Sequence, residues 1–150
     1  MDNTKDTLYL FVYGSLLRGL PQASFLSEPN RAVFVGEATI AAKLYDTGTF
    51  PAAVMPDNRD AEQNSQVYGE VYRINEPSTV FPTLDTIEGY NQQHPERSLF
   101  LRRSCEARHG EQTLEVQVYV YNQSIEGMQS IESGSYREHI TSQNREKLDD

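Results

Sequence analysis

The sequence predicts an α+β fold, a small mixed β-barrel with flanking helices, and three observations support this class. The predicted elements follow the order strand, strand, strand, helix, strand, strand. Most of the strands alternate apolar and polar residues, which favours a mixed or antiparallel sheet that can close into a barrel over a doubly wound parallel sheet. The chain has 150 residues, a length typical of one domain with a single hydrophobic core.

Three strands are predicted in the first half of the chain, at residues 8–12, 32–45 and 67–74. The first run has high strand propensity throughout and stops at Gly14-Ser15. Within the second run, Gly36 indicates a bulge or a bend. We expect two connecting segments between these strands: a short helical stretch at residues 21–26 and a polar, exposed loop at residues 57–65.

One amphipathic helix is predicted after the third strand. Val80, Leu84 and Ile87 are separated by four and three residues, so they share one face, which we expect to point toward the core. The Ser and Thr at residues 78–79 can cap this helix. Pro82 is compatible with it only if the helix begins just before this proline, within the first turn.

A β-hairpin is predicted next, because residues 99–105 and 114–121 both alternate and residues 109–110 between them form a turn. We expect residues 1–140 to form one domain. The charged residues 141–150 are expected to be a flexible tail.

Composition and charge exclude several classes of protein. The 13 Lys and Arg against 22 Asp and Glu give a net charge of −9, which disfavours binding to nucleic acids or anionic membranes. The single cysteine, Cys105, excludes an intrachain disulfide, and the histidines lack metal-ligand spacing, so we expect no metal site. The apolar run at residues 8–12 is too short for a signal peptide or a membrane span. We therefore expect a cytoplasmic protein.

The first candidate site is the segment Tyr13-Gly14-Ser15-Leu16 at the end of the first strand. A glycine there allows a sharp turn, and successive backbone N–H groups in such a turn can hold a carboxylate. The Ser15 hydroxyl could add a donor. An ordinary turn at the end of a strand is the alternative interpretation, and the residues alone favour it.

Glu88 is the second candidate. It follows Leu84 by four residues, at the edge of the inward face, and Gly89 is a natural residue to end the helix. At a helix C-terminus the dipole disfavours a carboxylate, which would raise the pKa of Glu88 and suit a general base near neutral pH. A solvated glutamate at a helix end is the alternative interpretation.

Taken together, six short segments in this order resemble the gamma-glutamylcyclotransferase-like family, especially its small bacterial members. The segments are Tyr13–Leu16, Phe50–Val54, Gly69–Ile74, Leu84–Gly89, Val118–Tyr121 and Ile131–Gly134, and the resemblance spans residues 8–137. It implies a small mixed barrel flanked by helices, with a cavity roofed by the first loop.

The resemblance also implies a reaction, the conversion of a γ-glutamyl amide into 5-oxoproline and a free amine without a metal or other cofactor. It implies that Tyr13, Gly14, Ser15 and Leu16 hold the glutamyl group of this small-molecule substrate. In the same way, it implies that Glu88 is the proton acceptor.

Supporting residues are less defined. Tyr119 or Tyr121 could donate a hydrogen bond to the oxyanion. The family commonly has a tyrosine followed two residues later by an arginine, and here Phe100 and Arg102 occupy these places, so one hydroxyl is missing. A non-catalytic module that binds a small amino-acid-like carboxylate on the same scaffold is the alternative function.

Overall fold

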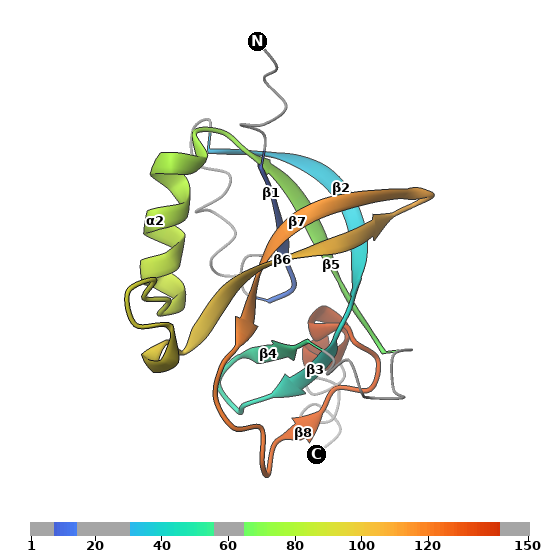
Figure 1. Cartoon of the computed structure of the whole chain (residues 1–150). Coiled ribbons are helices and arrows are strands. Elements are labelled where there is room, and N and C mark those ends of the chain that lie inside the picture. The colour runs from blue at the N-terminus through green and yellow to red at the C-terminus, as the bar shows by residue number, and fades with distance from the viewer. Residues whose placement is uncertain (1–7, 15–30, 56–64, 142–150) are drawn as a thin grey trace.

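The computed structural model describes residues 8–14, 31–55 and 65–141, and its centre is a closed five-stranded barrel (Figure 1). The barrel order is β1 (Leu8–Val12), β5 (Gln66–Ile74), β2 (Ala32–Ala41), β6 (Phe100–His109) and β7 (Gln112–Tyr121). Neighbouring strands are antiparallel, except that β7 closes the barrel by pairing parallel with β1. The predicted α+β class with a mixed barrel is confirmed.

A second, antiparallel sheet lies at one end of the barrel (Figure 1). Its order is β4 (Pro51–Val54), β3 (Lys43–Asp46) and β8 (Gln129–Ser130). The prediction of one strand over residues 32–45 is therefore wrong, because the chain leaves the barrel at Ala42 and β3 pairs with β4 and β8 instead. The predicted irregularity at Gly36 is confirmed, since the register between β2 and β5 shifts between Phe34 and Gly36.

The predicted helix is α2 (Pro77–Glu88), which lies along one side of the barrel (Figure 1). It begins at Pro77, and its N-cap is Glu76 in the left-handed conformation, with φ 50°, without a side-chain cap. Pro82 consequently falls in the second turn, and its expected place in the first turn is wrong. The carbonyl of Ser78 loses its usual donor, but Ser78 and Pro82 are both exposed, so water can bind that carbonyl.

Two clusters of buried side chains form the core. One fills the barrel and includes Phe11, Val71 and Val118, and the other lies between the barrel and α2. The helix buries Val80, Phe81, Leu84 and Asp85. The prediction that Ile87 points into the core is wrong. The inward face of the helix continues from residue 84 to residue 88, and Ile87 lies at the edge of this face, 48% exposed.

The remaining elements surround the hairpin and the C-terminal segment. The hairpin of β6 and β7 is confirmed, with its turn between His109 and Gln112, and η2 (Pro95–Arg97) precedes it. Residues 136–141 are helical. No helix in the described ranges is long and apolar enough to cross a membrane. Three predicted segments lie outside the described residues. These are the helical stretch at residues 21–26, the loop at residues 57–65 except residue 65, and the tail at residues 141–150 except residue 141.

Candidate active site

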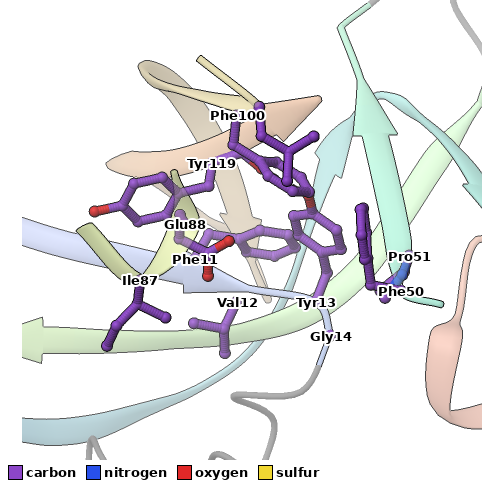
Figure 2. Close-up of a pocket in the computed structure, with 11 residues that line it drawn as sticks. Phe11, Val12, Tyr13, Gly14, Phe50, Pro51, Ile87, Glu88, Phe100 and Tyr119 are labelled. Atoms are coloured by element: carbon purple, nitrogen blue, oxygen red, sulfur yellow. The ribbon is translucent and has the colours of Figure 1, made fainter. Parts of the chain in front are cut away.

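A cavity of about 280 Å³ lies between the end of β1, the C-terminal end of α2 and the start of β6 (Figure 2). Its described lining residues are Phe11, Val12, Tyr13, Gly14, Phe50, Pro51, Ile87, Glu88, Leu99, Phe100 and Tyr119. Its size is near the lower end of the range for small-molecule pockets, roughly 300–1,000 Å³. The structure thus brings part of the predicted loop and the predicted base to one cavity, whereas Ser15 and Leu16 lie outside the described residues.

Tyr13 joins three elements at the end of β1. Its hydroxyl donates a hydrogen bond of 2.6 Å to the backbone carbonyl of Tyr119, and the backbone N–H of Ala53 donates to the Tyr13 hydroxyl at 3.3 Å. Burial raises the pKa of Tyr13 well above its usual value, so the hydroxyl stays neutral. Its ring therefore forms a fixed wall of the cavity. Its hydroxyl proton is used in the hydrogen bond to the backbone of β7.

Gly14 approaches the small sheet closely. A Cβ atom at this position would lie 2.8 Å from Cγ of Pro51, a distance that real Cβ atoms do not tolerate. A side chain here would push the turn away from β4 and change the cavity, which Gly14 and Pro51 both line. The glycine of the predicted loop is thus required by a close approach of the backbone to Pro51.

Glu88 is the last residue of α2, and Gly89 ends the helix in the left-handed conformation, with φ 71°. Figure 2 shows Glu88 beside Phe11 in the cavity. Its carboxylate has no hydrogen-bond or ion-pair partner among the residues that the structure describes. Burial raises the pKa of Glu88 to about 7. The direction is the one that the sequence predicts, and its cause in the structure is the loss of hydration on burial.

A second carboxylate, Asp85, lies one turn before Glu88 and is only 6% exposed. The Arg102 guanidinium donates from Nε to Oδ1 at 2.9 Å and from Nη2 to Oδ2 at 3.3 Å, and the Tyr119 hydroxyl donates to Oδ1 at 2.6 Å. Arg102 also stacks on the ring of Phe81, 4.6 Å from its centre. These contacts of Asp85, Arg102 and Tyr119, here called the Asp85 cluster, fasten the C-terminal turn of α2 to β6 and β7.

The Asp85 cluster was not predicted from the sequence. The segment Leu84–Gly89 contains Asp85, but no role follows for it from the local sequence. Its partners Arg102 and Tyr119 lie on β6 and β7, 17 and 34 residues farther along the chain. One signal was available, because Asp85 follows Phe81 by four residues and so lies on the buried face of the helix. A buried aspartate at such a place requires a partner of opposite charge or several donors.

The three supporting residues have different surroundings. Tyr119 lines the cavity, but its hydroxyl proton goes to Asp85, and burial together with this hydrogen bond raises the pKa of Tyr119 well above its usual range. Arg102 holds Asp85 and does not line the cavity. Tyr121 is also absent from the described lining and packs against Phe50 and Phe100, with ring centres 6.1 and 5.5 Å away.

The walls of the cavity are mainly apolar. Phe100, which occupies the place of the expected tyrosine, is buried and lies 5.5 Å from the ring centre of Phe50. Glu88 is the one acidic side chain among the described lining residues, which include no Lys, Arg or His. Cys105 lies elsewhere, on β6, and burial raises the pKa of its thiol to about 11, so it is a poor nucleophile. The described residues contain no cluster of His, Cys, Asp or Glu able to hold a metal ion.

This combination of a small mixed barrel and a cavity with one protonatable carboxyl can be compared with known proteins. A family model described as gamma-glutamyl cyclotransferase, AIG2-like, matches residues 10–138. The gamma-glutamylcyclotransferase family protein ytfP of Citrobacter rodentium (strain ICC168) is 30% identical over 128 residues, which cover 85% of this chain and 93% of that protein.

Solved structures share the fold. YkqA from Bacillus subtilis superimposes with a TM-score of 0.69 at 21% identity, over 93% of this chain and 43% of YkqA. The solution structure of ytfP from Escherichia coli gives a TM-score of 0.61 at 27% identity, over 89% of this chain and 99% of that one. The chain belongs to the gamma-glutamyl cyclotransferase, AIG2-like family.

Proposed function

We propose that this protein converts a γ-glutamyl amide into 5-oxoproline and a free amine, with Glu88 as the proton acceptor. The observation that carries the proposal is the carboxyl of Glu88, which shares a cavity with Gly14, has no hydrogen-bond or ion-pair partner among the described residues and has a pKa of about 7. A carboxyl with this pKa changes its protonation readily at neutral pH, as a general acid and base must.

The proposed reaction moves two protons from the substrate's α-ammonium nitrogen to the nitrogen of the departing amine. The substrate's α-ammonium group, with an ordinary pKa of about 7.7–8.0, first loses a proton to the Glu88 carboxylate. The freed amine attacks the γ-carbonyl carbon and forms the five-membered ring. When the tetrahedral intermediate collapses, the bond to the amine half breaks, and the proton held by Glu88 is returned to the departing nitrogen. The ring nitrogen gives its remaining surplus proton to the regenerated Glu88 carboxylate, which passes it to the released amine, so the amine leaves as an ammonium ion. No oxidant or second substrate is needed.

Positioning supplies much of the expected rate. Because nucleophile and carbonyl belong to one molecule, the site has to hold the folded-back conformer, which can be worth roughly 7–11 kcal/mol. We propose that the backbone amides of the segment Tyr13–Leu16 hold the substrate α-carboxylate. The net charge of −9 repels this anion at long range, so binding has to depend on oriented amides at short range.

The test is an assay of 5-oxoproline release from a panel of γ-glutamyl amides. We expect the wild-type protein to release it and Glu88→Gln to be slower by about 10²–10⁴-fold, the usual contribution of a general acid–base group. Glu126→Gln, at an exposed turn, is the matched control and should keep full activity.

Two results would contradict the proposal: no release from any amide, or equal release by wild type and Glu88→Gln. Calorimetry with glutamate and 5-oxoproline, run beside the assay, then decides the alternative. Tight binding of either compound without turnover would identify a binding module on this scaffold.

A further inference from the structure

We propose that the amine half of the substrate is apolar and uncharged, so that the site prefers γ-glutamyl amides of aliphatic or aromatic amines to those whose amine half carries a carboxylate or an ammonium group. This inference rests on the proposed function, because it assigns the part of the cavity beyond the glutamyl group. Three points support it: the position of the leaving nitrogen beside Glu88, the apolar side chains at the rim of the cavity, and the lack of Lys, Arg or His among the described lining residues.

The leaving nitrogen has to lie beside Glu88, because Glu88 returns the proton to it in the proposed reaction. The amine half therefore extends from Glu88 along the cavity or over its rim. The residues that adjoin Glu88 at this rim are Ile87, on the last turn of α2, and Leu99, directly before β6. The backbone N–H of Leu99 donates to the carbonyl of Gly89 at 3.0 Å, which holds the two rim segments together.

The rim and the adjoining wall are apolar. Ile87 is 48% exposed and Leu99 is 39% exposed, although both are large aliphatic side chains. Farther along the cavity, the rings of Phe50 and Phe100 pack together, and Pro51 adjoins them (Figure 2). An aliphatic or aromatic amine half would cover exposed apolar surface at this rim, and each buried methylene should improve binding about four-fold.

Charge on the amine half lacks a suitable partner here. The described lining residues include no Lys, Arg or His, and the nearby Arg102 is committed to Asp85 and Gln117. A carboxylate would leave water for apolar walls beside the acidic Glu88. Among the described lining residues, an ammonium group would find only the Glu88 carboxylate as an anion, and an ion pair there would stabilise the ionised carboxylate and weaken it as a base.

Two matched pairs of substrates test the inference. γ-Glutamyl-isopentylamine differs from γ-glutamyl-leucine only by the carboxylate of leucine, and γ-glutamyl-pentylamine differs from γ-glutamyl-1,5-diaminopentane only by an ammonium group. We expect kcat/KM to be at least ten-fold higher for the uncharged member of each pair. Lengthening an alkylamine from two to four carbons should raise kcat/KM about four-fold per methylene.

Variants of the rim connect this preference to the structure. Ile87→Ser and Leu99→Ser should reduce the preference for the uncharged substrates several-fold, because both side chains are exposed and their loss leaves the core intact. Val33→Ser is the matched control, since Val33 is an exposed aliphatic residue, 43% accessible, on β2 and does not line the cavity. It should leave the preference unchanged.

The outcomes separate this inference from the function on which it rests. Equal or faster turnover of the charged members would overturn the apolar preference and leave the cyclotransferase proposal standing. The inference would also be overturned if Ile87→Ser, Leu99→Ser and Val33→Ser all kept the wild-type preference. Absence of 5-oxoproline from every substrate, the charged members included, would overturn both proposals.

Discussion

Asp85 and Glu88 are two carboxylates in the last turn of one helix, and their surroundings are opposite. Asp85 receives hydrogen bonds from Arg102 and Tyr119, whereas Glu88 has no partner among the described residues and faces the apolar side chains of the cavity. The strands opposite α2 make this difference, because β6 and β7 present donors to Asp85 and β1 presents Phe11 beside Glu88.

The comparison shows how one helix turn can carry two different tasks. A carboxylate that accepts hydrogen bonds from a guanidinium and a hydroxyl group fastens the helix to the barrel. The buried carboxyl of Glu88, which has no partner among the described residues, holds its proton up to a pH of about 7 and can exchange it there. The following variants test this division, beginning with the largest expected effect on stability.

Removal of the partnered carboxylate should have the largest effect. Asp85→Ala leaves the Arg102 guanidinium and the Tyr119 hydroxyl without their acceptor, and we expect the free energy of unfolding to fall by about 3 kcal/mol. Urea unfolding followed by circular dichroism measures this loss, with Glu126→Ala as the exposed control. A loss below about 1 kcal/mol would show that the Asp85 cluster does not hold the helix.

Removal of the Glu88 carboxylate should instead raise the free energy of unfolding at neutral and alkaline pH. The pKa of Glu88 is raised from 4.5 to about 7, so between these values the folded protein binds a proton that the unfolded chain releases. Wild-type stability should therefore fall as the pH rises from about 4.5 to about 7, and Glu88→Gln should escape this loss. At pH 8 we expect Glu88→Gln to be more stable than wild type by about 3 kcal/mol, and at pH 4 the two should be alike.

Unfolding of wild type and Glu88→Gln at pH 4 and pH 8 gives this difference. Glu126→Gln corrects for general charge effects. A stability difference that does not grow with pH would contradict the raised pKa of Glu88.

The smallest expected effect comes from a single atom of the Asp85 cluster. Tyr119→Phe removes the hydroxyl that donates to Asp85, and we expect a loss of about 1.5 kcal/mol, because Arg102 still holds the carboxylate. Tyr121→Phe is the matched control, since Tyr121 lies two residues away on β7. An equal loss of unfolding free energy in both variants would mean that the hydrogen bond from Tyr119 to Asp85 does not stabilise the protein.

Local sequence patterns predicted the parts of the fold that depend on neighbouring residues. The alternation in residues 114–121 indicated β7, and the spacing of Leu84 and Glu88 placed the candidate base on the edge of the buried face. The pairing partners of β3 could not be predicted, because they depend on strands that are distant in the sequence. The same holds for the Asp85 cluster, whose bonds join three elements.

Ile87 illustrates a different limit. A helix with a spacing of three and four residues has two possible edges to its apolar face, and the pattern alone does not say which edge turns outward. The barrel buries the edge with Asp85 and Glu88 and leaves Ile87 at the rim of the cavity. Packing against the strands therefore decided which side chains of α2 reach the core.

The central claim, that Glu88 is the proton acceptor, is tested most directly by the pH dependence of kcat/KM for a γ-glutamyl amide whose amine half is uncharged. This quantity reports ionisations of the free protein and the free substrate. The account predicts that kcat/KM rises through an apparent pKa of about 7 on the acid side, and that Glu88→Gln loses this limb along with most of its activity. A profile that is flat between pH 6 and pH 8, or an acid limb that persists unchanged in Glu88→Gln, would contradict it.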